Sequence, residues 1–401
     1  MKFKDYKYER ITYEEISATY PLLINDLRKC DSAQSFMDQF KKINLYRGHI
    51  MTMLTLSSVR HTMDTSDAFY DAENEYWDNT YPLYQAFDVD FMKACLECPF
   101  RNELDIPKTF FMLAENSLKS FDEKIIADMQ EENKLVTEYG KLKAGAKIAF
   151  DGEIYNLASI APKLTDPDRD VRRRAYAAYN QFFEDNEEKF DEIYDKLVKL
   201  RDTMAKKLGY ENYTPLGYLR MNRLDYDQDM VANYRKQVVK DIVPIVTKLH
   251  ARQAKRIGVE SLKFYDGGYQ FKSGNPKPSG SIDELVDAAL RMYKEMSPET
   301  GEFFQTMVDK ELFDLPTRPN KEMGGYCTDL FDYKVPFIFA NANGTQGDVD
   351  TLTHEAGHAF QSYLSQKTID IPDICFPTME SAEIHSMSME QFAYPCIEMF
   401  F

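Results

Sequence analysis

The sequence has little of what would place it in a membrane, in the secretory pathway or on nucleic acid. No apolar run approaches the roughly 18 residues that a membrane-spanning helix requires. The start of the chain lacks the apolar core of a signal peptide, so we expect a cytoplasmic protein. The net charge is −17, with Lys and Arg interspersed among acidic residues, which disfavours nucleic acid because its phosphates require a basic face.

Cysteine is also sparse, with six residues scattered along the 401-residue chain. Cys95 and Cys98 form a lone C-x-x-C, and no second pair at zinc-finger spacing accompanies it. We therefore expect no structural zinc there and interpret all six as reduced, packed thiols. Hydrophobic residues make up 43% of the chain, which is enough for a sizeable core.

Apolar residues recur at helical spacing along most of the chain, and few segments are rich in strand-forming residues. We therefore predict a mainly α protein. The length is compatible with two or three domains or with one large helical body. We place an N-terminal helical region at 1–190 and a catalytic region at 191–401.

Local signals predict where several elements begin and end. Thr165–Asp168 is typical of a helix start, and Ser281–Glu284 has the pattern of a capping box. Gly209 predicts the end of a helix. Asp151–Gly152 joins two short apolar runs and predicts a β-hairpin turn. Residues 266–280, rich in Gly, Pro and Ser, predict a long loop.

Histidine is scarce too, with six in the chain, yet two of them stand in the run His354-Glu355-Ala356-Gly357-His358. This run matches H-E-x-x-H, the zinc-binding pattern of metallopeptidases. On a helix, His354 and His358 project from the same face and can hold one Zn²⁺. Glu355, beside the open coordination position, can take a proton from a water.

A solvated amphipathic helix could carry the same run without a metal, but the flanking residues argue against this. Gly357 costs about 1 kcal/mol relative to Ala within a helix, which makes sense if another backbone passes close by. Asp348 or Asp350 can cap the helix or lie in its first turn. An apolar stripe at helical spacing lies opposite the two histidines: Val349, Leu352, Ala356, Ala359 and Tyr363.

A catalytic zinc takes three protein ligands and leaves a fourth position for water. A second helix is predicted to begin near Thr378. Glu383, Ser386 and Glu390 share one of its faces, but spacing alone does not choose the third ligand. The alternative for each Glu is a solvated carboxylate on the protein surface, which is the usual environment of Glu. The candidates are Glu380, Glu383, His385 and Glu390.

Residues 335–341 predict a strand just before the metal-binding helix. Pro336 confines this strand to the edge of a sheet or places it at the strand's beginning. An edge strand there can pair with the backbone of an extended peptide. A buried structural strand is equally compatible with the sequence alone.

The stretch from Gly324 to Glu390 resembles the oligoendopeptidase F branch of the M3 zinc metallopeptidases, relatives of thimet oligopeptidase. Arg60–Thr65 and Ser273–Pro276 resemble the same branch, so the resemblance covers nearly the whole chain. The matching pieces are Gly-Gly-Tyr-Cys (324–327), Pro-Phe-Ile-Phe (336–339), Asn-Gly-Thr (343–345), Gly-Asp-Val-Asp (347–350), His-Glu-Ala-Gly-His-Ala-Phe-Gln (354–361) and Glu-Ser-Ala-Glu-Ile-His-Ser-Met-Ser-Met-Glu (380–390).

The resemblance implies a bowl-shaped, helical, zincin-type metallopeptidase with a small β element before the His-Glu-x-x-His helix. It implies one Zn²⁺ bound by His354, His358 and Glu383, with Glu355 as the general base that acts on a metal-activated water. It favours a substrate-binding role for the strand and its continuation, in particular Phe337, Phe339, Asn341 and Asn343. We also predict that Asp350 and Glu390 orient the ligands, and we leave His385 as structural.

The resemblance further implies an endopeptidase that cleaves internal bonds of short, unstructured oligopeptides. Family members continue beyond the position where this sequence stops. We therefore expect that the C-terminal part of the family fold is absent, or is supplied by another chain. Two other functions fit the same residues: a zinc carboxypeptidase of similar helical fold, and a non-catalytic peptide-binding fragment with a zinc site.

Overall fold

The computed structural model describes residues 1–401, of which 69% are helical. This confirms the mainly α class. The helices are α1 (Tyr13–Arg28), α2 (Ala33–Met63), α3 (Ala68–Leu96), α4 (Lys108–Ser120), α5 (Ile126–Ala144), α6 (Ala161–Leu164), α7 (Arg169–Asp185), α8 (Glu187–Lys207), α9 (Tyr213–Arg220), α10 (Gln228–Gln237), α11 (Val243–Ile257), α12 (Ile282–Met296), α13 (Pro298–Asp309), α14 (Gly347–Thr368), α15 (Pro372–Cys375) and α16 (Met379–Ala393).

The strands form two small sheets. A hairpin pairs β1 (Ile148–Phe150) with β2 (Glu153–Tyr155). A three-stranded sheet has the order β3 (Phe313–Pro316), β5 (Val335–Ala342), β4 (Tyr326–Leu330), with β3 parallel and β4 antiparallel to the central β5. This sheet directly precedes α14, so the β element lies where the sequence predicted it.

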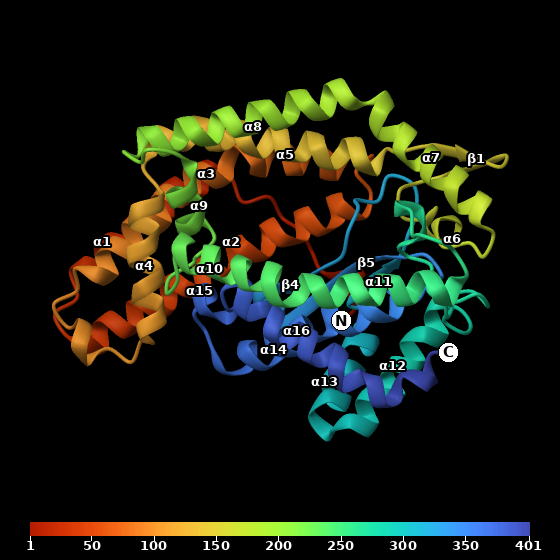
Figure 1. Ribbon diagram of the computed structural model, residues 1–401. Helices are drawn as coiled ribbons and strands as arrows, with labels where there is room; N and C mark the ends of the chain where they lie inside the picture. Colours follow the sequence, from red (N-terminus) through yellow and green to blue (C-terminus); the bar gives the residue numbers. More distant parts are fainter.

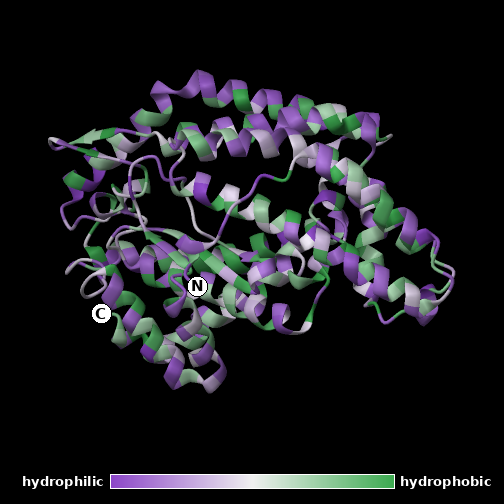
Figure 2. Cartoon of the chain, turned by 180° about the vertical axis from the view of Figure 1, so that it is seen from behind, coloured by the Kyte–Doolittle hydropathy of each residue, from purple (hydrophilic) through white to green (hydrophobic).

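The helices form an upper layer and a lower body in Figure 1. The long helices α3, α5 and α8 pack side by side in the upper layer. The three-stranded sheet, α14 and α16 lie in the lower body, where α14 packs on both β5 and α16. The hydropathy colouring shows the upper α8 as mostly hydrophilic, whereas hydrophobic residues are frequent around the sheet (Figure 2).

A single cluster of 49 buried hydrophobic residues extends from Phe3 to Phe400. It joins side chains of α1 to α4 with those of the sheet and of α12 to α14. The division after residue 190 stays a prediction, and α8 continues through that position without a break. None of the helices is both long enough and apolar enough to cross a membrane.

Several local predictions are confirmed. The turn of the β1–β2 hairpin consists of Asp151 and Gly152, both at positive φ. Ser281 and Glu284 form the capping box of α12. Gly209, at φ +90°, directly follows Leu208, the C-cap of α8. At the other predicted helix start, the cap is Asp168, whose side chain accepts from the N–H of Asp170.

A buried ion pair ties the beginning of the long loop to α7. The side chains of Asp266 and Arg172 are 0% and 2% exposed, and Oδ1 of Asp266 lies 2.9 Å from Nη2 of Arg172. Arg169 adds a second ion pair at 2.7 Å. Burial by itself raises the pKa of Asp266, but hydrogen bonds from Arg169, the N–H of Lys263 and Arg172 lower it to about 2.

We predict that Asp266→Ala lowers the free energy of unfolding by about 3–5 kcal/mol at pH 7, because it leaves the Arg172 guanidinium buried without its partner. The pKa of Asp266 is below its ordinary value of 3.8, so its contribution is complete above that pH and is lost as pH falls toward 2. Urea titrations at pH 7 and pH 3 should therefore show a smaller difference between variant and wild type at pH 3. Asp170→Ala, which removes exposed ion pairs with Arg173 and Arg174, is the control and should cost less than about 1 kcal/mol.

Candidate metal centre and active site

The turn between β5 and α14 fixes where the His-Glu-x-x-His helix begins. Asp348, in the first turn of α14, accepts hydrogen bonds from the backbone N–H groups of Asn343 and Gly344 at 2.7–3.1 Å. Burial raises the pKa of Asp348, and these backbone donors oppose the rise. The apolar stripe of α14 is buried as predicted, in Val349, Leu352, Ala356, Ala359 and Tyr363. The opposite face of α14, which carries His354 and His358, is thereby directed away from the core.

The backbones of α14 and α16 cross in close contact at Gly357. A Cβ atom at this position would lie 2.6 Å from Cα of Ser386 and 2.9 Å from the carbonyl oxygen of His385. Only a residue without a side chain fits there. The close approach of a second backbone, predicted from the glycine, is therefore present, and the second backbone is that of α16.

The crossing brings His354, His358 and Glu383 together. One potential ligand atom from each residue lies within 4.8 Å of the other two. Nε2 of His354 lies 3.1 Å from Oε2 of Glu383, and Nε2 of His358 lies 3.8 Å from Oε1 of the same carboxylate. The side chains are 26%, 11% and 53% exposed respectively, so the group opens to solvent on the Glu383 side.

The other ring nitrogen of each histidine has its own partner on α16. Nδ1 of His354 lies 2.7 Å from Oε1 of Glu390, and Nδ1 of His358 lies 3.1 Å from Nε2 of His385. The hydroxyl of Ser386 donates to Oε2 of Glu383 at 2.9 Å. Both Nε2 atoms are thus left to face Glu383, which is the arrangement that metal-binding histidines commonly adopt.

Glu355 lies on the same helix and is only 7% exposed. Its Oε2 atom is buried and accepts no hydrogen bond from the protein. Burial raises the pKa of Glu355 to about 7, with the nearby His354 lowering it and Glu383 raising it. Burial also lowers the pKa of His358 to about 4, so this imidazole is neutral at pH 7, the form that binds metals.

The remaining candidates for the third ligand and the orienting groups differ in their contacts. Glu380 pairs with Arg223, whose guanidinium lies 2.8 Å away. Asp350 accepts a hydrogen bond only from the side chain of Gln346, at 3.4 Å, and contacts neither histidine. The structure thus places Glu390 at a ligand imidazole and gives Asp350 no such contact. His385, which the sequence left as structural, instead contacts the ring of His358.

No sequence signal pointed to that role of His385. It lies two residues after Glu383, and this spacing puts it on a different face of an ideal helix. Its side chain reaches His358 because the two helix backbones are so close at Gly357. The contact is therefore a product of tertiary packing.

Of the two placements that Pro336 allowed for residues 335–341, the edge of a sheet is wrong, because β5 is the central strand, and the beginning of a strand is correct. Pro336 is tolerated since it stands at the strand's second residue. Phe337 and Phe339 are 0% and 1% exposed, so their side chains pack in the core and present no surface to a substrate. The alternative interpretation of this segment, a buried structural strand, describes it correctly.

Asn341 and Asn343 are partly exposed and shape the neighbouring loops. The side-chain amide of Asn341 donates to the carbonyl oxygens of Glu322 and Gly324, both at 2.8 Å. The side-chain oxygen of Asn343 accepts from the hydroxyl of Thr345 at 2.7 Å. The outer edge of the sheet on this side belongs to β4, which pairs only with β5.

Gly325, just before β4, lies against the Glu355 carboxylate. A Cβ atom at Gly325 would lie 3.4 Å from Oε1 of Glu355 and 3.3 Å from Cγ2 of Thr351. The beginning of the free strand edge is therefore adjacent to Glu355. Sequence reasoning placed Gly325 within the resembling segment without assigning it a role.

Two family models match the chain. The model of the peptidase M3 N-terminal domain matches residues 3–121, and that of peptidase family M3 matches residues 164–395. Solved structures of similar proteins include PZ peptidase A with an inhibitor, at 47% identity and a TM-score of 0.98 over 100% of this chain and 71% of that chain. A protein of Bacillus anthracis str. Ames described as an oligoendopeptidase F has 45% identity and a TM-score of 0.98, over 100% and 74% of the two chains.

Among curated proteins, an oligoendopeptidase F homolog of Borreliella burgdorferi is 24% identical over 236 residues. The match covers 57% of this chain and 38% of that protein. The chain thus spans about two fifths of the length of this curated relative, and 58% of the next two relatives.

We predict that Gly357→Ala lowers the free energy of unfolding by about 1–3 kcal/mol, because the added methyl group meets the backbone of α16. This cost outweighs the gain of about 1 kcal/mol in helix propensity. Zinc affinity, measured by competition with a chelator, should fall as well because Glu383 moves away from the histidines. Gly140→Ala in α5, where the nearest atom is the carboxylate end of the Glu322 side chain, is the control and should change stability by less than about 1 kcal/mol. An unchanged stability and zinc affinity for Gly357→Ala would contradict the close crossing.

Proposed function

Because the chain belongs to peptidase family M3, we propose that it is a zinc-dependent endopeptidase that hydrolyses internal bonds of short, unstructured oligopeptides. One observation carries this proposal. A group of two imidazoles and one carboxylate lies beside a buried carboxylate that has an oxygen without a partner. This is the constellation that metal-assisted hydrolysis requires.

The chemistry of the donor set fits zinc. Two nitrogen donors and one oxygen donor, His354, His358 and Glu383, match the ligands of catalytic zinc sites, which keep a fourth position open. The two Nε2 atoms and the Glu383 carboxylate face one another, so a single ion can contact all three. When bound, zinc supplies a Lewis acid that polarises the scissile carbonyl and lowers the pKa of a water.

Glu355 acts as the general base in this proposal. Its unpartnered Oε2 accepts a proton from the attacking water and then passes that proton to the nitrogen of the leaving amine. The pKa of about 7, caused by burial, lies near neutral pH, where a carboxylate can both take up and release a proton.

Glu390 and His385 act as positioning residues. Each contacts the Nδ1 atom of one ligand imidazole, which fixes the ring so that Nε2 points toward Glu383. Ser386 similarly holds one oxygen of the Glu383 carboxylate. All three positioning groups come from α16, so the orientation of the ligands depends on this helix.

The free edge of β4 is the surface we propose for the peptide backbone. An extended peptide paired with this edge passes beside Gly325 and therefore beside Glu355. This role, first expected of β5, is transferred to β4 because β5 is paired on both sides. The names of the relatives, oligoendopeptidases, describe internal cleavage of short peptides, and we extend that activity to this chain.

We predict that Glu355→Gln keeps one bound zinc per chain but loses at least about 10³-fold in kcat, because the amide cannot accept the proton. Metal analysis and mass spectrometry of a mixed peptide pool measure both properties. Internal cuts in the wild-type products support an endopeptidase, whereas stepwise loss of C-terminal residues would indicate a carboxypeptidase. Turnover near the wild-type rate in Glu355→Gln would refute the assignment of the base.

We predict that His354→Ala and Glu383→Gln each weaken zinc binding by at least about 10²-fold and abolish peptide cleavage, because each removes one of three ligands. Glu380→Gln is the matched control on the same helix, since Glu380 pairs with Arg223 and is not part of the group of potential ligands. It should keep full zinc binding. Zinc affinity is measured by competition with a chelator of known affinity, and a variant of His354 that still binds one zinc tightly would exclude that ligand.

A further inference from the structure

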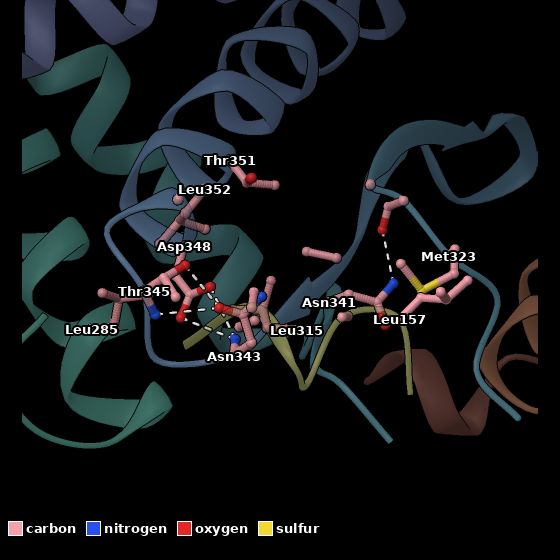
Figure 3. A pocket seen from close by; sticks show the side chains of 17 residues that line it. Leu157, Leu285, Leu315, Met323, Asn341, Asn343, Thr345, Asp348, Thr351 and Leu352 are labelled. Carbon is pink, nitrogen blue, oxygen red and sulfur yellow. Dashed lines mark hydrogen bonds between the residues drawn. The ribbon is translucent and has the colours of Figure 1, made fainter. Parts of the chain in front are cut away.

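A cavity of about 360 Å³ lies at the end of the sheet where β5 leads into α14 (Figure 3). Asn341, Leu157 and Met323 stand on one side of it, and Asp348, Asn343 and Thr345 stand on the other. Most of the remaining wall is aliphatic. Nine hydrophobic residues line the cavity: Leu157, Ala158, Ala161, Leu285, Leu315, Met323, Ala340, Ala342 and Leu352.

The cavity contains no basic side chain that could bind an anion. Its single ionisable residue is Asp348, whose two carboxylate oxygens already accept hydrogen bonds from the N–H groups of Asn343 and Gly344. An acidic side chain entering the cavity would face Asp348 without a cation. A basic side chain would lose its hydration against an apolar wall, and its only acidic partner, Asp348, already accepts backbone hydrogen bonds. The lining thus favours an uncharged, apolar group.

The cavity adjoins the proposed site of hydrolysis. Gly325 and Thr351 both line it, and a Cβ atom at Gly325 would lie 3.4 Å from Oε1 of Glu355 and 3.3 Å from Cγ2 of Thr351. Thr351 precedes Glu355 by one turn of α14, on the same side of the helix. A peptide bond held at Glu355 therefore has its neighbouring side chains within one residue of the cavity, because an extended chain advances about 3.3 Å per residue.

We propose that this cavity is a specificity pocket that binds a large apolar side chain, such as Phe or Leu, of one of the two residues flanking the scissile bond. This inference rests on the proposed function. The volume is sufficient, since a cavity of about 150 Å³ already holds a benzene ring. Asn341 and Asn343, expected to contact substrate, line this pocket, whereas Phe337 and Phe339 do not.

Binding of peptides to the zinc-loaded Glu355→Gln chain tests the pocket without relying on turnover. The probes are capped heptapeptides of Gly and Ser with a single central Phe, Leu, Ala, Asp or Lys, and isothermal titration gives their Kd values. We expect the Phe and Leu peptides to bind at least about 10-fold more tightly than the Ala peptide. The Asp and Lys peptides should bind no more tightly than the Ala peptide. Equal affinity for Phe, Leu and Ala would overturn the proposal.

Two substitutions that fill the pocket from different walls test its location. Ala161→Leu and Ala342→Leu replace partly exposed alanines of the lining, and each should reduce the preference for Phe over Ala to less than about 3-fold. Ala232→Leu on α10, at a partly exposed alanine outside the pocket, is the control and should leave the preference unchanged. Circular dichroism and Tm verify that each variant is folded. A preference that persists in whichever filled variants fold would overturn the proposal.

Cleavage of the same peptides by the chain with Glu355 intact separates this inference from the proposed function. If the peptides are cut next to Phe and Leu, and the pocket-filling substitutions move or remove these cuts, both the pocket and the peptidase activity are supported. If peptides are cut with no preference at either flanking residue, the pocket is refuted and the peptidase stands. If nothing is cut but the binding preference disappears on filling, the pocket stands and the proposed activity falls.

Discussion

The close crossing of α14 and α16 at Gly357 is the constraint on which the rest of the site depends. Two of the proposed ligands come from one helix and the third from the other, so the group assembles only if the two backbones nearly touch. A glycine permits this approach, and the buried apolar stripe of α14 sets the rotation that directs His354 and His358 toward α16. The packing of one helix pair thereby determines a chemical site.

Burial and charge act against each other around this crossing. Burial disfavours the charged forms of Glu355 and His358, which leaves a neutral imidazole and a carboxyl group with a pKa near 7. Glu383 is half exposed and stays in contact with solvent, so the carboxylate of the proposed ligand set avoids most of the cost of desolvation. The group therefore combines a buried carboxyl group, the proposed base Glu355, with a solvent-accessible carboxylate, the proposed ligand Glu383.

The sequence was sufficient for features that depend on neighbours along the chain. The helical class, the hairpin at Asp151–Gly152, the capping box at Ser281 and the shared face of His354 and His358 all follow from local spacing. The spacing left four candidates for the third ligand, because only the crossing decides which side chain of α16 faces the histidines. Spacing also left open whether residues 335–341 form an edge strand or a buried one, since strand order is set by distant segments. The role of Asp350 stays a prediction, because a position in the first helical turn does not show which way the carboxylate is directed.

Residues 343–346, the short turn between β5 and α14, link the strand's direction to the rotation of the helix. Hydrogen bonds to Asp348 fix the conformation of this turn, so α14 starts at a set angle from the sheet. One residue corresponds to about 100° of helical rotation. An insertion or deletion of a single residue in this turn would rotate α14 about its axis. The two imidazoles, Glu355 and Thr351 would then turn together away from α16 and the β4 edge. Most surface connections tolerate a change in length, but this turn must keep its length for the group to form.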